Sequence, residues 1–221
     1  MARTAGGKAR LSTGASGSRL DVAAAQKASE PVLAFRRAAE WQAWLKAHHA
    51  SSEAVLLRID KTGAGLGYAA ALDIALAWGW IDSQKRTLDA GAWLQRFSKR
   101  KAQSPWSKIN CVKVQSLIAS GAMRPPGLAE VERARADGRW ARAYDGARAS
   151  AVPEDLAAAL ARDRKADAFF KALDGANRYA ILYRVQTAKK AQTRAERIAK
   201  FVALCARGET VHPPAKKKPP R

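Results

Sequence analysis

The chain has 221 residues, of which 48% are hydrophobic, so it is long enough for one domain or two small ones with a real core. Forty lysines and arginines against 19 acidic residues give a formal net charge of +21 at pH 7. Two cysteines exclude a disulfide framework, and no apolar run reaches the length of a membrane span. A charge of this sign attracts polyanions and repels cations.

The two terminal segments differ in composition from the rest. Residues 1–30 are rich in Ala, Gly, Ser and Arg, and residues 213–221 read PPAKKKPPR; both are predicted to be disordered basic tails. Residues 31–212 still hold 31 basic and 17 acidic residues, so the folded part itself carries +14. Because the first 30 residues contain no continuous apolar segment, we expect a cytoplasmic protein, with Cys111 and Cys205 reduced and buried.

The N-terminal half is expected to form a small α+β unit, a short sheet with helices covering one face. Trp41, Trp44 and Leu45 have helical spacing, whereas Val55 and Leu57 alternate with more polar neighbours as in a strand. The expected elements are a helix over 37–49, a strand over 54–60, a helix over 68–78, and strands over 79–86 and 92–97.

From about residue 105 onward the pattern is helical. A capping box at Thr193–Glu196 is expected to begin the last helix, and Gly208 to end it. The fold class is therefore α+β, with a small N-terminal sheet and covering helices followed by a mostly helical C-terminal part. The expected organisation is an α+β unit at 31–100, a helical connector at 101–149 and a helical module at 150–212, between tails at 1–30 and 213–221.

Several phrases resemble a known family. They include ALDIALAWGWID at 71–82, SPWSKIN at 104–110 and NRYAILYRVQTAKKAQTRAERI at 177–198. In this order, over residues 31–213, they are similar to the YdeI/OmpD-associated (OmdA-like) family, often labelled bacteriocin-protection proteins. Ser83 and Lys99 depart from the family's expected Gly and Pro. The resemblance implies a helical OmdA-like module at 150–212 and implies no established reaction or cofactor.

Residues 78–110 combine four tryptophans with many basic and amide side chains. Lysine and arginine contact phosphates, and exposed aromatic rings stack on single-stranded bases, so we expect a nucleic acid or other polyanion as the partner. The alternative is that the tryptophans belong to the core and the basic residues to a solvated face. The expected ligand-binding residues are Asp82, Gln84, Lys85, Trp93, Arg96, Arg100, Trp106, Lys108 and Asn110. The expected polyanion-binding residues are Arg178, Arg184, Lys189, Lys190, Arg194, Arg197 and Lys200.

The first expectation is a non-enzymatic protein, because the chain contains no GxSxG, Walker A, HExxH or Rossmann glycine pattern. A second hypothesis is an enzyme or small-anion receptor with its pocket around Asp82 and Lys85. A third is an interaction module whose C-terminal helices dock an acidic protein partner. No metal and no cofactor are expected, since adjacent His48 and His49 point to different sides of a helix. Because cationic bacteriocins would be repelled, any protective or stress-tolerance role is expected to be indirect.

Overall fold

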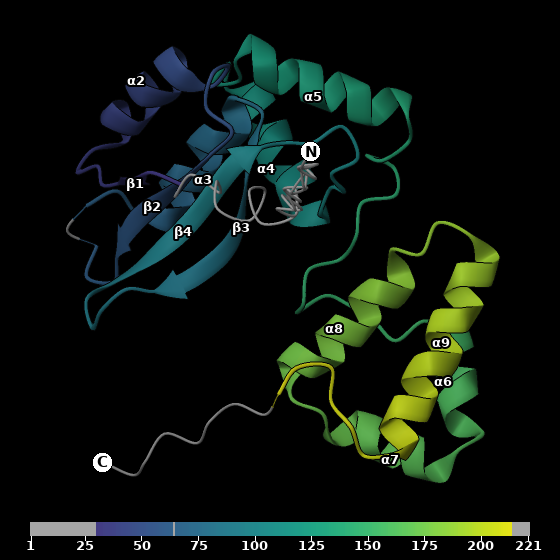
Figure 1. Cartoon of the computed structure of the whole chain (residues 1–221). Helices are drawn as coiled ribbons and strands as arrows, with labels where there is room; N and C mark the ends of the chain where they lie inside the picture. Colours follow the sequence, from purple (N-terminus) through teal and green to yellow (C-terminus); the bar gives the residue numbers. More distant parts are fainter. Residues whose placement is uncertain (1–29, 64, 214–221) are drawn as a thin grey trace, which may run out of the picture.

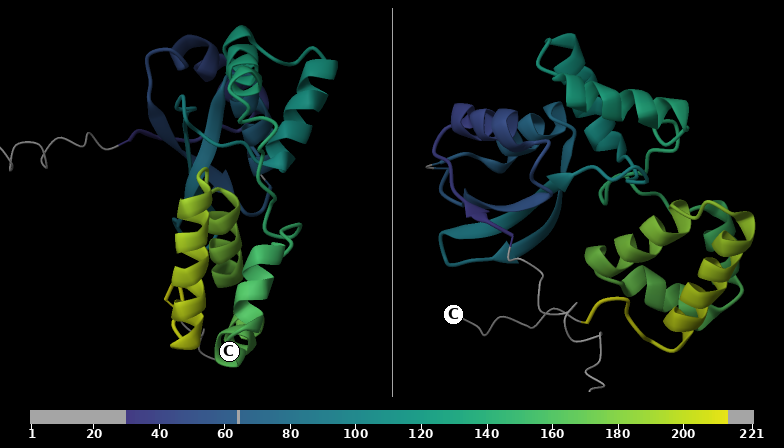
Figure 2. Two further views of the ribbon diagram at one scale, coloured as in Figure 1. Left: turned by 90° about the vertical axis from the view of Figure 1, so that its right-hand side faces the viewer. Right: turned by 45° about the horizontal axis from the view of Figure 1, so that its top comes forward.

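The computed structural model describes residues 30–63 and 65–213, so nearly all of both predicted tails lies outside it. The described residues form one four-stranded sheet and eight helices, which confirms the α+β class. The elements fall into two groups: the sheet with helices α2 to α5, and a separate bundle of α6 to α9 (Figures 1 and 2). None of the described helices is long and apolar enough to cross a membrane.

The strands and helices follow the predicted order closely. The N-terminal elements are β1 (Val32–Leu33), α2 (Ala38–His48), β2 (Ala54–Asp60), α3 (Tyr68–Ala77), β3 (Trp80–Thr87) and β4 (Ala92–Lys99). The remaining elements are α4 (Lys108–Ala119), α5 (Pro125–Ala136), α6 (Glu154–Ala161), α7 (Arg164–Ala172), α8 (Gly175–Gln186) and α9 (Ala191–Ala206).

The sheet has the order β1-β2-β4-β3, with β1 parallel to β2 and the other pairs antiparallel. Opposite Val55 on β2 lies Phe97 on β4, and both side chains are fully buried. Because side chains alternate along a strand, this register brings one apolar face of the sheet under the helices. The sequence did not predict β1, since two residues are too few to show an alternating pattern.

The first core lies between the sheet and helices α2 to α5 (Figure 1). Trp41 is completely buried, and its indole nitrogen donates a hydrogen bond to the carbonyl of Ala71 at 3.1 Å. Val114 of α4 and Val131 of α5 belong to the same core. The expected connector at 101–149 is therefore corrected, because its two helices complete the N-terminal unit. Gly127 allows the close approach of α5 to Ala77, whose carbonyl a Cβ atom would strike.

The second core joins α6 to α9 and includes Leu156, Phe170 and Ile181. Gly208 ends α9 with a φ of 70°, as predicted. The predicted capping box is wrong, because α9 begins at Ala191, one turn before the expected start. The Glu196 side chain accepts a hydrogen bond from Gln192 within the helix instead of closing its first turn.

Candidate functional site

Two of the cations predicted in the aromatic segment, Arg96 and Lys108, already have acidic partners, and so does Lys99 of the same segment. Arg96 binds Glu30, Lys99 binds Glu53 and Lys108 binds Asp145, with shortest nitrogen–oxygen distances of 2.7, 2.8 and 2.7 Å. The sequence places these acids 66, 46 and 37 residues away from their partners, so the charge pairing was invisible in the segment itself. A polyanion that binds these three cations would have to displace or share the carboxylates that they already hold.

Trp106 and Arg100 are buried together. The guanidinium of Arg100 lies 3.5 Å from the centre of the Trp106 ring, and the two residues are 5% and 1% exposed. Burial lowers the pKa of Arg100 to about 10, because it removes the charge from water. Asn110 is also buried. The expectation that Trp106 stacks on a base is therefore wrong, since no face of its ring reaches the surface.

Asp82 and Lys85 lie on β3 but have separate partners. The hydroxyl of Tyr68 donates to Asp82 at 2.6 Å, and burial, together with this carboxylate, raises the pKa of Tyr68. Lys85 lies 4.3 Å above the half-buried ring of Trp93. Between them the pairing with β4 shifts register at Ser83 and Gln84. No hydrogen bond or salt bridge joins Asp82 to Lys85 in the part of the chain that the structure describes.

One residue at this register shift was not predicted from the sequence. Gln95 of β4 is only 4% exposed, and its amide donates to the backbone carbonyls of Ser83 and Gln84 at 3.2 and 3.4 Å. The alternation of Trp93, Gln95 and Phe97 on one face of β4 was the available signal, because it places a polar amide among core side chains.

Three of the predicted polyanion-binding residues come together in the C-terminal bundle. Arg184 of α8 and Arg197 and Lys200 of α9 line a hollow of about 460 Å³. Its other walls are Phe201, Leu204, Thr210 and Val211, so no carboxylate belongs to the lining. The two arginines donate to neutral backbone carbonyls, those of Ala180 and Arg184 respectively. We call the three cations and their hollow the α8–α9 groove.

The other members of that predicted set lie elsewhere. Arg194 binds Asp155 at 2.6 Å, and its guanidinium holds the pKa of that carboxyl below the usual range. Arg178 lies 4.9 Å from the Phe170 ring centre. Lys189 and Lys190 are exposed in the turn between α8 and α9. Of the seven residues, the structure thus gathers three into one hollow and leaves Arg194 neutralised.

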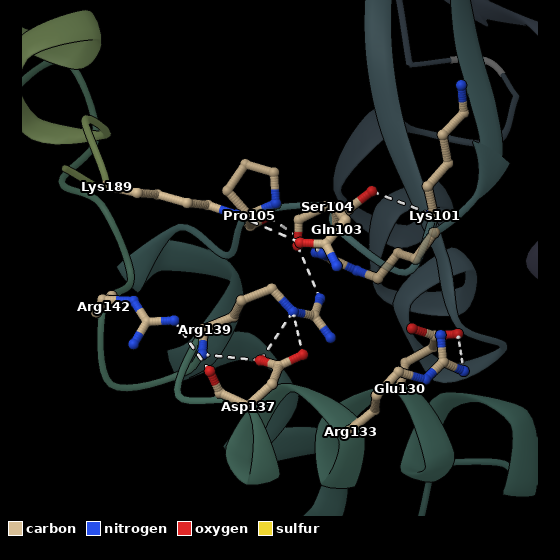
Figure 3. A network of polar contacts seen from close by, with 11 residues as sticks. Lys101, Gln103, Ser104, Pro105, Glu130, Arg133, Asp137, Arg139, Arg142 and Lys189 are labelled. Atoms are coloured by element: carbon tan, nitrogen blue, oxygen red, sulfur yellow. Dashed lines mark hydrogen bonds and ion pairs between the residues drawn. The ribbon is translucent and has the colours of Figure 1, made fainter. Parts of the chain in front are cut away.

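A polar network that the sequence did not predict joins the two units (Figure 3). Arg139, only 6% exposed, donates from Nε to both oxygens of Asp137 at 2.7 and 2.9 Å and from Nη1 to the Ser104 carbonyl at 2.9 Å. Lys189 reaches across from the C-terminal bundle to the Gln103 side chain at 3.3 Å. Helix α5 ends at Ala136, so Arg139 follows directly after the helix end, and nothing in the local sequence indicates its role.

A second contact between the units is centred on Asp145. It binds Lys108 of α4 at 2.7 Å and accepts from the Gln186 amide of α8 at 2.7 Å. The hydrogen bond from Lys108, followed by that from Gln186, lowers the pKa of Asp145. Nearby, the rings of Tyr144 and Tyr183 meet edge to face at 4.9 Å. No group of His, Cys, Asp or Glu among the described residues is arranged to hold a metal ion.

Comparison with known families separates the same two units. Residues 33–130 match a domain of unknown function, DUF8412, and residues 149–208 match OmdA, described as Bacteriocin-protection, YdeI or OmpD-Associated. No curated protein and no solved structure shows a significant match to the chain. The resemblance predicted over 31–213 is confirmed for its C-terminal part, whereas the N-terminal unit matches a different model. The helical bundle of α6 to α9 is therefore the part of the chain that matches the OmdA model, and we call it the OmdA domain.

Proposed function

We propose that this protein binds a polyanion, with nucleic acid as the expected partner, through the α8–α9 groove. One observation carries the proposal: Arg184, Arg197 and Lys200 line a single hollow whose lining contains no carboxylate. Phosphate groups are the natural counterions of such a cluster, since each contact releases a condensed cation from the nucleic acid.

The partners of the cations in the N-terminal unit support placing the interface on the OmdA domain instead. Four cations of the aromatic segment are paired or buried, namely Arg96, Lys99, Arg100 and Lys108, whereas Lys85, Arg86 and Lys101 of the same segment are exposed. Binding a phosphate at Arg96, Lys99 or Lys108 would require breaking an existing salt bridge, and the exposed cations of the segment share no hollow with one another among the pockets described above. In the α8–α9 groove the arginines hold only backbone carbonyls, so a phosphate would add a charged partner without displacing one.

The proposed mode of binding uses charge without base stacking. Trp106 is buried and Trp93 is half-buried beneath Lys85, and both belong to the other unit. We therefore expect binding that depends steeply on salt and differs little between single and double strands. A protein with net charge +21 repels cationic bacteriocins, so it would not capture them directly. We therefore expect any tolerance role to be indirect and to act through a polyanion in the cytoplasm.

The test is binding of the full chain to labelled duplex DNA, single-stranded DNA and RNA across a salt series. A variant with Arg184, Arg197 and Lys200 all changed to Gln should bind more weakly, and its salt slope on duplex DNA should fall by about 2 to 3, since each phosphate contact contributes about 0.9. The matched control changes Arg164, Lys165 and Lys171 on the exposed surface of α7 to Gln, removing the same charge from the same domain.

Two outcomes contradict the proposal. Unchanged affinity and slope in the groove variant would show that these cations do not contact the polyanion. An equal loss in the α7 control would show that binding depends on total charge and not on the groove.

A further inference from the structure

A cavity of about 380 Å³ lies between the two units, beside the network of Figure 3. Its walls come from three segments far apart in sequence: the loop at 103–105, the segment at 139–144, and the turn at 186–189 between α8 and α9. Cavities of about 300 to 1,000 Å³ hold small ligands in other proteins, so this volume is sufficient for a small molecule.

The lining of this cavity is basic. Arg139, Arg142 and Lys189 contribute three cations, and no carboxylate lines it. The two nearest acids that make contacts here are already engaged: Asp137 with Arg139, and Asp145 with Lys108. Arg142 donates to the carbonyl of Asp137 at 2.9 Å and Lys189 donates to the amide oxygen of Gln103, so both hold neutral oxygens. Two positive charges at the cavity thus lack a carboxylate bound to them.

The donors around the cavity are positioned before any ligand arrives. Arg139 is fixed by Asp137 and by the Ser104 carbonyl, and its remaining nitrogen, Nη2, is buried without a hydrogen-bond partner. Native proteins seldom leave a buried donor unpaired, and no described group of the chain pairs with this one. Tyr144 also lines the cavity, and its hydroxyl is able to donate, because a tyrosine keeps its proton at neutral pH; burial raises its pKa further, to about 12.

We propose that this cavity binds a small molecule carrying a phosphate group, held between the OmdA domain and the N-terminal unit. The basic side chains approach from separate segments, Arg139 and Arg142 from one unit and Lys189 from the other, which suits the tetrahedral oxygens of a phosphate better than the two coplanar oxygens of a carboxylate. A phosphate monoester carries nearly two negative charges at pH 7, matching the two uncompensated cations. Pro105 and Ala188 provide apolar wall for the remainder of the ligand.

This site is independent of the α8–α9 groove, because the two hollows share no lining residue. It also has a consequence for the whole molecule. A ligand that touches both walls would help to hold the two units in one relative orientation, since the described contacts between them include only a few polar bonds around Gln103, Asp145 and Gln186 and the ring pair of Tyr144 and Tyr183. Either proposal can fail while the other stands.

The experiment is titration calorimetry of the full chain with inorganic phosphate, glycerol 3-phosphate and adenosine monophosphate, with succinate as the carboxylate arm. Arg142→Gln and Lys189→Gln should each weaken phosphate-ester binding about tenfold, as expected for loss of one charge-assisted hydrogen bond. The matched controls are Lys190→Gln, which removes the neighbouring exposed lysine, and Arg148→Gln, an exposed arginine near the same segment; neither residue lines the cavity. Both controls should bind within about twofold of the parent protein.

A second readout tests whether the ligand bridges the units. Amide hydrogen exchange at Gln103, Ser104 and 186–189 should slow when adenosine monophosphate is present and stay unchanged in the double variant Arg142→Gln/Lys189→Gln. Both changes are at exposed residues, so the variants should fold, which far-ultraviolet circular dichroism would confirm. The proposal is overturned if no phosphate compound binds, if succinate binds as tightly, if the double variant binds normally, or if Lys190→Gln loses as much as Lys189→Gln.

Discussion

The two units of this protein have nearly the same charge balance and use it differently. Residues 33–130 contain 14 basic and 7 acidic residues, and residues 149–208 contain 12 and 6, a twofold excess in both. In the first unit the predicted cations are mostly bound to acids or buried beside an aromatic ring. In the OmdA domain Arg184, Arg197 and Lys200 share a hollow without acids. Net charge alone therefore does not tell where an anion can bind.

The two cores also differ in composition, which makes them separable in experiments. All seven tryptophans lie between residues 41 and 140, in or against the first core, and the OmdA domain has none. Tryptophan fluorescence consequently reports on the first unit, whereas far-ultraviolet circular dichroism reports on helices of both units. Substitutions in one unit can be compared with matched substitutions in the other.

The largest effect is expected from Trp41→Ala. Trp41 is completely buried, packs against Phe35, Trp44, Trp80 and Phe97, and donates to the Ala71 carbonyl. Its removal should lower the free energy of unfolding of the first unit by about 3 to 5 kcal/mol. Urea unfolding followed by tryptophan fluorescence should show the loss.

The matched change in the OmdA domain is Leu156→Ala, at a side chain that is also completely buried. It should destabilise the bundle by about 2 to 5 kcal/mol and shift the dichroism transition, with a much smaller shift in tryptophan fluorescence. If both substitutions move both signals equally, the units unfold as one, and the division into two independent cores is wrong.

A smaller loss of stability is expected when a buried cation is removed, and almost none when an exposed cation is removed. Arg100→Ala should destabilise the first unit by about 2 to 3 kcal/mol, because the side chain packs on Trp106 and its aliphatic stem fills the core. Lys200→Ala, at an exposed groove residue, should change the free energy of unfolding by less than about 0.5 kcal/mol. Thermal and urea unfolding of the two variants would check this difference. If both variants lose the same stability, the distinction between the buried Arg100 and the exposed Lys200 is wrong.

The smallest effect concerns the contact between the units and depends on pH. The pKa of Asp145 is lowered in the folded protein, chiefly by the hydrogen bond from Lys108, so the stabilisation is present above the unfolded pKa of about 3.9 and is lost as pH falls through the lower folded value. Asp145→Asn should cost about 1 kcal/mol or less at pH 7 and progressively less below about pH 4.

Unfolding of both proteins across a pH series measures the Asp145 effect. The two stability curves should converge at low pH, where the carboxyl of the parent protein is neutral. Parallel curves from pH 7 to pH 2 would show that the charge of Asp145 contributes nothing to the contact with Lys108 and Gln186.

Local sequence patterns were sufficient for most of the elements. The alternation of Val55, Leu57 and Ile59 predicted β2, which the structure places at the expected residues. The short β1 was missed, because it is defined by pairing with β2 and not by its own pattern. Helices α4 and α5 were predicted as helices but assigned to a connector, since helical periodicity shows which face is apolar and not what covers that face.

The candidate sites were only partly predictable for the same reason. Arg197 and Lys200 are three residues apart on one helix, so their proximity follows from sequence. Their approach to Arg184 depends on how α8 packs against α9. Arg139 and Arg142 were not predicted, because the network around them is formed by residues far away in the sequence. Ser104 lies in the N-terminal unit and Lys189 in the C-terminal bundle.

The sequence by itself determined the class of fold, the order of the elements, the basic charge and the OmdA resemblance of the C-terminal domain. These properties depend on composition and on interactions within a few residues, which a linear pattern records. Only the tertiary structure decided which cations are free, because salt bridges and hydrogen bonds join residues such as Arg96 and Glu30, 66 positions apart, or Lys189 and Gln103, 86 positions apart. Whether a lysine or arginine is a structural ion or a binding group depends on such distant partners.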